Sequence, residues 1–130
     1  MIDHISIAVT DLKKSGKFYD AVFSGLGMAR VADRAGTIGY GKKYPEFWLN
    51  SRLQMAPVAE DCGSHVCLRA RSEEIVRRAH EAALAGGGSD AGAPGPRQGE
   101  LTPYFGAFFK DPDGNKIEIV TFPVVADSKG

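Results

Sequence analysis

Apolar and polar residues alternate at the start of the chain, between Ile2 and Thr10. One set of alternate positions is apolar and comprises Ile5, Ile7 and Val9. Successive side chains of a β-strand point to opposite faces, so this period of two predicts a strand with one buried face. His4, Ser6 and Ala8 fall on the other face.

The pattern then changes to the spacing of a helix, with an apolar stripe that runs to about Phe23. Thr10 or Asp11 can cap its start, and Gly25 and Gly27 end it. Gly, Pro and Lys turns separate the three strands predicted next, which are Arg30–Asp33, Thr37–Gly41 and Glu46–Met55. The first half of the chain therefore reads strand, helix, three strands.

This pattern occurs twice. The segment that begins at His4 aligns with the one that begins at His65, an offset of 65 − 4 = 61 residues, and the same offset pairs Gly25 with Gly86. The second copy predicts a strand over Ser64–Arg71 and a helix that Ser72 caps. An internal repeat indicates a fold built from two similar units.

The end of the second half is less regular. Ser89–Thr102 is rich in Gly and Pro without a hydrophobic period, which predicts a mobile loop that could close as a lid. Two further strands, Tyr104–Lys110 and Lys116–Phe122, are joined by an Asp111–Asn115 turn. We expect an α+β fold of two βαβββ modules in one curved mixed sheet, with module 1 at about 1–58, module 2 at about 62–123, and a flexible tail at 124–130.

Composition narrows the functional class. The 130 residues carry 16 basic and 16 acidic side chains, and this zero net charge argues against nucleic acid and anionic membranes as partners. No apolar run is long enough for a membrane span, and the first residues do not resemble a signal peptide. We therefore expect a cytoplasmic protein whose two cysteines, Cys62 and Cys67, are buried thiols.

Three side chains on faces that the helices do not cover are candidates for chemistry: His4, His65 and Glu118. Two imidazoles and a carboxylate suit a divalent ion such as Zn, Ni, Mn or Fe(II). The alternative is that each is an ordinary hydrogen-bonded residue of a sheet. We expect His80, on the second helix, to have a structural role.

The His4–Leu12 segment, the second start at His65 and the D-P-D-G-N-x-I-E run that ends at Glu118 together resemble the vicinal oxygen chelate superfamily. This group contains glyoxalase I, the bleomycin-resistance proteins and the extradiol dioxygenases. The resemblance implies paired βαβββ modules around a metal in a U-shaped cavity, and usually a homodimer. It places the metal ligands at His4, His65 and Glu118. A fourth comes from 46–50, where either Glu46 is the ligand or Trp48 occupies its position.

The resemblance also implies a function. The leading hypothesis is a lyase or isomerase resembling lactoylglutathione lyase, which acts through an ene-diolate on a small substrate whose two vicinal oxygens chelate the metal. Glu118 would be the catalytic base. The candidate substrate contacts are Arg69, Trp48, Asn50 and Tyr104. Ala8 stands where glutathione-using glyoxalases tend to have arginine. The resemblance therefore does not decide whether glutathione is the thiol of the substrate. The alternatives are a metal-free protein that sequesters a ligand and an Fe(II) extradiol-type dioxygenase.

Overall fold

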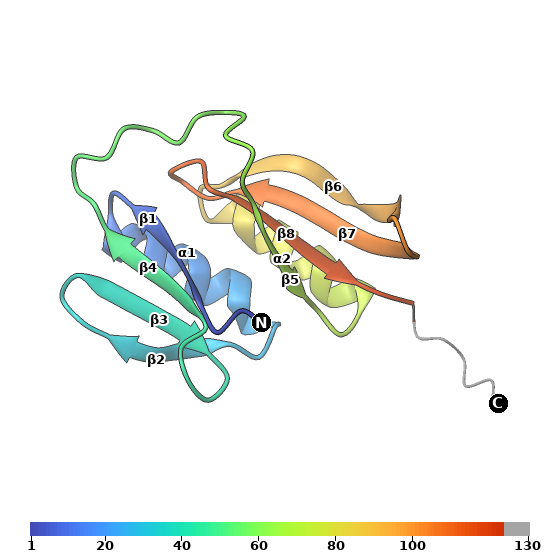
Figure 1. Ribbon diagram of the computed structural model, residues 1–130, viewed down its shortest axis with the longest axis horizontal. Coiled ribbons are helices and arrows are strands. Elements are labelled where there is room, and N and C mark those ends of the chain that lie inside the picture. The colour runs from blue at the N-terminus through green and yellow to red at the C-terminus, as the bar shows by residue number, and fades with distance from the viewer. Residues whose placement is uncertain (124–130) are drawn as a thin grey trace.

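The computed structural model describes residues 1–123 and contains two βαβββ modules (Figure 1). The elements of the first are β1 (Ile5–Val9), α1 (Leu12–Ser24), β2 (Ala29–Asp33), β3 (Thr37–Gly41) and β4 (Phe47–Ser51). Those of the second are β5 (Val66–Arg69), α2 (Glu73–Ala85), β6 (Ser89–Gln98), β7 (Pro103–Lys110) and β8 (Lys116–Thr121). The predicted α+β class is confirmed. The predicted tail, 124–130, lies outside the described residues.

The repeat is confirmed at the level of the helices. α1 and α2 start 73 − 12 = 61 positions apart and end 85 − 24 = 61 positions apart. The side chains of Asp11 and Ser72 each accept a hydrogen bond from a backbone N–H three residues further on, which caps the two helices in the same way. Gly25 and Gly86 are the corresponding C-caps. The shared 61-residue offset therefore reflects a duplicated structural unit.

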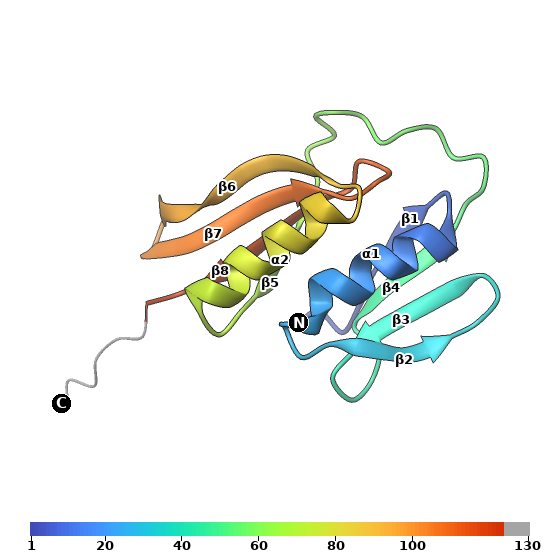
Figure 2. The ribbon, with the colours of Figure 1, turned by 180° about the vertical axis from the view of Figure 1, so that it is seen from behind.

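Each module forms its own four-stranded mixed sheet. The strand orders are β1-β4-β3-β2 and β5-β8-β7-β6, with parallel first pairs and antiparallel remaining pairs. The two sheets lie next to each other, and both helices lie on the same side of them (Figures 1 and 2). The end of α1 meets the start of α2, where Gly25 lies against Ile75. Within residues 1–123, no helix lies over the opposite face of either sheet.

The core lies between the helices and the sheets. In the first module, the largest fully buried side chains are Phe18, Tyr19, Phe23, Tyr40, Phe47 and Leu49. In the second, Phe109, Ile117 and Ile119 are fully buried in the same way. Aromatic rings of this size bury much apolar surface, and neighbouring rings pack edge to face, as Phe23 does with Tyr40.

The prediction of a mobile loop over Ser89–Thr102 was wrong. Most of this segment is β6, which pairs with β7 from Ser89 opposite Lys110 to Gln98 opposite Pro103. It is an edge strand with two register shifts between Asp90 and Gly95, and edge strands accept Pro and bulges because only one side of the backbone pairs. Its hydrogen bonds come from the neighbouring strand, so the segment needs no hydrophobic period of its own.

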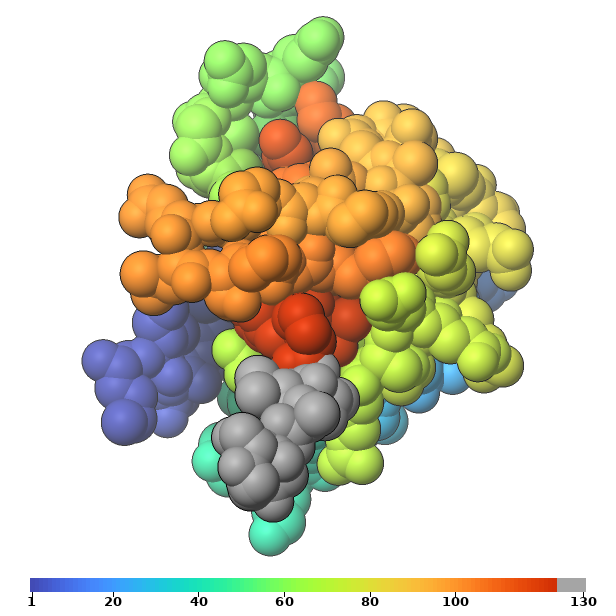
Figure 3. All heavy atoms as spheres, turned by 90° about the vertical axis from the view of Figure 1, so that its right-hand side faces the viewer, coloured from blue at the N-terminus to red at the C-terminus, as the bar shows by residue number. Residues whose placement is uncertain are grey.

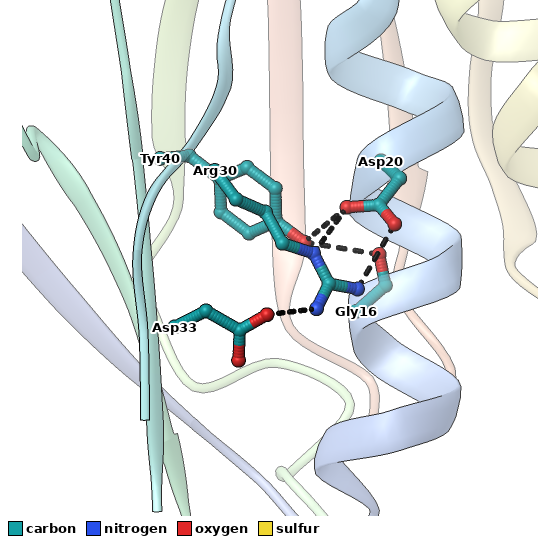
Figure 4. A network of polar contacts seen from close by, with 5 residues as sticks. All are labelled: Gly16, Asp20, Arg30, Asp33 and Tyr40. Atoms are coloured by element: carbon teal, nitrogen blue, oxygen red, sulfur yellow. Dashed lines mark hydrogen bonds and ion pairs between the residues drawn. The ribbon is translucent and has the colours of Figure 1, made fainter. Parts of the chain in front are cut away.

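A polar cluster fixes α1 to β2 and β3 (Figure 4). The Arg30 guanidinium donates to both carboxylate oxygens of Asp20, at 2.8 and 2.9 Å, and to Asp33 at 3.0 Å. The Tyr40 hydroxyl lies 2.9 Å from Asp20 Oδ1 and 3.0 Å from the Gly16 carbonyl oxygen. This is the scaffold of the first module, and it lies on the helix side of the sheet.

Neither helix within 1–123 has the length and apolar character of a membrane span.

Candidate functional site

Three of the predicted site residues, His65, Tyr104 and Glu118, come together on the uncovered face of the second sheet. Ile117 and Ile119 are fully buried toward α2, so Glu118 between them points to the other face. In the strand register, Cys67 of β5 and Phe108 of β7 flank Glu118. The alternation predicted for β8 is therefore confirmed.

Glu118 is held on both carboxylate oxygens. Nε2 of His65 lies 3.1 Å from its Oε1, and the Tyr104 hydroxyl donates to its Oε2 at 3.1 Å. Only 5% of Glu118 is exposed, which is unusual for a glutamate without an arginine or lysine partner. Burial and the bond to Glu118 raise the pKa of Tyr104, so its hydroxyl stays a donor at neutral pH.

A hollow of about 330 Å³ opens over this carboxylate. Its walls are Cys67, Tyr104, Glu118, Val120, Phe122 and residues 99–102. Leu101, at the tip of the β6–β7 hairpin, is 97% exposed on its rim. Figure 3 shows the atoms of this hairpin, in orange, beside the end of β8, in red. Leu101 and Phe122 were not among the predicted site residues, although Phe122 continues the alternation of Glu118 and Val120.

Cys67 corrects a second prediction. Both cysteines are free thiols, but they are exposed residues rather than buried ones. Cys67 lies on the uncovered face of β5, as the alternation predicted, and β5 is an edge strand, so no neighbouring strand covers the residue on one side. The sulfur is nevertheless partly withdrawn from water, and this burial, together with the negative charge of Glu118, raises the pKa of Cys67 to about 12. The thiol is therefore a poor nucleophile at neutral pH.

The first sheet carries a second hollow, of about 400 Å³, on its own uncovered face. His4, Trp48 and Asn50 line it, together with Asp3, Ser6, Tyr44 and Pro45. His4 is exposed, and its Nδ1 lies 2.7 Å from Asp3 Oδ1. The Trp48 ring lies over Gly39, where a Cβ would come within 2.9 Å of it. His4 and Trp48 thus form a half-site separate from that of Glu118.

The remaining predicted site residues lie in different places, and two of them, Glu46 and Arg69, line neither of these hollows. Glu46 is exposed and precedes β4, while Trp48, opposite Ser6 in the register, faces the hollow. Of the two candidates for the fourth position, Trp48 lines this hollow and Glu46 does not. Arg69 lines neither hollow: its guanidinium stacks 4.7 Å from the centre of the Phe122 ring. The residue contributes to the lining of a third hollow between the modules.

The residues of one chain fit part of a metal site. Nitrogen and oxygen donors 3.1 Å apart, as in the His65–Glu118 pair, can share one ion whose bonds are about 2.0–2.2 Å long. Within 1–123, however, no three His, Cys, Asp or Glu side chains are close enough to hold a metal. The structure therefore brings together His65 and Glu118, and leaves His4 on the other sheet.

Comparison with known proteins agrees with this architecture. A family model described as the glyoxalase/bleomycin resistance protein/dioxygenase superfamily matches residues 1–119. The crystal structure of a glyoxalase/bleomycin resistance protein from Albidiferax ferrireducens T118 superposes with a TM-score of 0.81 and 31% identity, over 93% of this chain and 98% of that chain.

Two more solved structures are similar. A glyoxalase-related enzyme from Fulvimarina pelagi has a TM-score of 0.66 and 26% identity, over 98% of this chain and 94% of that one. The fosfomycin resistance protein FosX from Listeria monocytogenes has the same fold, with a TM-score of 0.68 and 20% identity, over 95% and 94%. Among curated proteins, no sequence matches this chain. The family model and the Albidiferax structure confirm the resemblance seen in the sequence: the chain belongs to the glyoxalase/bleomycin resistance protein/dioxygenase superfamily.

Proposed function

We propose that the protein is a metal-dependent lyase or isomerase that acts on a small molecule with oxygens on neighbouring carbons. The observation that carries this proposal is the pair formed by His65 and Glu118, whose donor atoms lie 3.1 Å apart, with Glu118 in the wall of the hollow of about 330 Å³. A buried carboxylate beside an imidazole is an unusual feature for a scaffold to retain, because burying a charge costs free energy. Family membership supports the same class of chemistry.

The site requires a second copy of the chain to be complete. One chain offers His65 and Glu118 on one uncovered sheet face, and His4 with Trp48 on another. In a two-fold dimer, the first module of one chain would face the second module of its partner, and two equivalent sites would form. His4 would then supply the third ligand, with Trp48 and Asn50 as substrate contacts.

Glu118 would act as the base. A bound divalent ion supplies Lewis acidity that stabilises negative charge on the substrate oxygens. The carboxylate of Glu118 would take a proton from one carbon and return it to its neighbour. The Tyr104 hydroxyl, a donor to Oε2, orients this carboxylate, and Leu101 and Phe122 offer apolar surface to the substrate.

Metal content and subunit mixing test the composite site. We expect near-stoichiometric metal in the wild type, and its loss in both His4→Ala and His65→Ala. When these two variants are mixed and re-paired, half of the dimers are mixed and each of these has one intact site, so about one quarter of the wild-type content should return. The third histidine of the chain, His80, is buried against Asp90 and gives the control His80→Gln, which should keep its metal.

The outcomes separate the arrangements. Loss of metal in both variants without recovery on mixing would mean that the site lies within one chain. Metal in neither the wild type nor the variants, after incubation with Zn, Ni, Mn and Fe(II), would refute the metal-dependent proposal.

Turnover of a panel of hemithioacetals tests the role of Glu118. Replacement by Gln keeps the shape but removes the base, so we expect a loss of about 10²–10⁴-fold in kcat. Glu81→Gln, an exposed change on α2, is the control and should be neutral. Undiminished turnover in Glu118→Gln would exclude this glutamate as the base.

A metal-free protein that sequesters a ligand is the second candidate. The observation that favours it is Trp48, a half-buried indole in the wall of an open 400 Å³ hollow. An exposed aromatic face of this kind suits a flat apolar or cationic ligand. Quenching of Trp48 fluorescence by ligands in chelator-treated protein, without turnover, would support it.

A further inference from the structure

The residues that line a hollow between the two modules include three basic ones. It has a volume of about 460 Å³ and lies where the end of α1 meets the start of α2. Its lining residues are Gly25, Leu26, Gly27, Lys42, Arg69, Ala70, Arg71 and Ile75. No acidic residue contributes to this lining.

The three cations also have no acidic partner elsewhere in the described part of the chain. No carboxylate within 1–123 lies within 4.0 Å of a side-chain nitrogen of Lys42, Arg69 or Arg71. By contrast, Arg30 pairs with Asp20, and Arg78 pairs with Glu74. Within 1–123, none of these three basic side chains therefore forms an ion pair.

The three side chains come from separate parts of the fold. Lys42 follows β3, and its Cε lies near Gly27, at the end of α1. Arg69 ends β5, where the Phe122 ring supports its guanidinium, and Arg71 precedes the N-cap Ser72 of α2. Like charges gathered in one concavity repel one another unless an anion is shared between them. Tertiary packing, and not local sequence, brings them together.

We infer that this hollow binds a small dianion, either a phosphate group or a dicarboxylate. Arg offers a planar fork of donors that matches both of these groups, and Lys adds a point charge. The site is distinct from the Glu118 hollow, since the two share no lining residue. It therefore goes beyond the proposed function and stands whether or not a metal is bound.

A simpler role for these cations is to neutralise the negative end of the α1 dipole, since α1 has no basic residue in its last turn. The two roles predict different behaviour. A helix-dipole role makes Lys42 and Arg71 matter for stability alone, whereas an anion site makes them matter for ligand affinity.

The test is a ¹⁵N NMR titration of the chelator-treated full-length chain with sodium phosphate and, separately, with sodium succinate, at constant ionic strength. We expect saturable shifts in the amides of Gly27, Ala70 and Arg71 with at least one of the two anions. Lys42→Gln and Arg71→Gln should each weaken that binding by about fivefold or more, the loss of one charge-assisted contact. The anion that saturates the shifts at the lower concentration shows whether the hollow prefers a phosphate group or a dicarboxylate.

Lys43→Gln is the matched control, because it removes the same charge from the adjacent residue, which does not line the hollow. Its affinity should stay within about twofold of the wild type, as expected for a peripheral charge. The inference is overturned by shifts that do not saturate with either anion, or by equal weakening in Lys42→Gln and Lys43→Gln. It is also overturned if Lys42→Gln and Arg71→Gln lower stability and leave anion affinity unchanged.

Discussion

The Thr10 hydroxyl donates to Oδ1 of Asp113 at 2.6 Å, across 103 positions of sequence. The backbone N–H of Thr10 also donates to the other carboxylate oxygen of Asp113, at 3.1 Å. Close by, the side-chain amide of Asn115 donates to the carbonyl oxygen of Ala8 at 2.9 Å. The turn between β7 and β8 thus holds the end of β1, so the D-P-D-G-N motif joins the two modules as well as turning the chain.

Thr10→Val should therefore destabilise the protein. It keeps the shape of the side chain but leaves one oxygen of a half-buried Asp113 without its donor, which costs about 1–2 kcal/mol of unfolding free energy. Urea denaturation measures the loss. The control is Thr37→Val, because the Thr37 hydroxyl is buried without a hydrogen-bond partner within 1–123, so its removal should be neutral or stabilising. Equal losses in both variants would mean that the tie to Asp113 contributes little.

Asp111 is a second anchor of the same turn. Its carboxylate accepts the Tyr19 hydroxyl at 2.8 Å, the backbone N–H groups of Asp113 and Asn115 at 2.9 Å each, and the Asn115 side-chain amide at 2.9 Å. Asn in its place would turn an NH₂ group toward these donors, so we expect Asp111→Asn to cost about 2–4 kcal/mol. Tyr19→Phe removes only one donor and should cost less. Denaturation midpoints of both variants check the order, and the reverse order would contradict it.

Asp20 should make stability depend on pH in the acid range. Burial pushes its pKa up, but hydrogen bonds from Arg30 and Tyr40 outweigh burial and leave the pKa of Asp20 lowered. A carboxyl group with a lowered pKa stabilises the fold above its unfolded pKa of about 3.9, and this contribution disappears as the pH falls through the folded value. Asp20→Asn should thus be less stable than the wild type at pH 7, by under about 1 kcal/mol for so exposed a pair. The gap should narrow as the pH falls below about 3.9 and through the lowered pKa of folded Asp20. Urea unfolding at pH 7 and across the acid range measures this change, and a constant gap would mean that the ionised form is unimportant.

Cys67 should react slowly with alkylating reagents. The thiolate is the reactive form, and burial together with the charge of Glu118 raises the pKa of Cys67 to about 12. Glu118→Gln removes that charge, so the alkylation rate of Cys67 at pH 8 should increase several-fold, with the exposed Cys62 as internal reference in the same digest. Mass spectrometry after timed iodoacetamide treatment gives both rates. An unchanged Cys67 rate would show that Glu118 does not control this thiol.

Local pattern determined every element of the described chain except β6, and it determined the duplication. Helix boundaries 61 residues apart follow from caps and apolar spacing that each segment carries itself, and the faces of β5 and β8 follow from alternation. The motif that ends at Glu118 was the most specific of the features that together indicated the family, because its turn residues have conformational requirements that few other sequences meet. The sequence also placed His65 and Glu118 on uncovered faces.

Tertiary structure alone decided which segments and side chains that are distant in sequence come into contact. β6 has no period of its own and forms because β7 offers it hydrogen bonds, which no local pattern encodes. His4 and Glu118 occur on equivalent faces of the repeat, yet they lie on separate sheets because each module closes its own. The convergence of Lys42, Arg69 and Arg71 depends on how α1 packs against α2. Contacts of this kind arise from the packing of distant elements, and alternation and capping specify only the elements themselves.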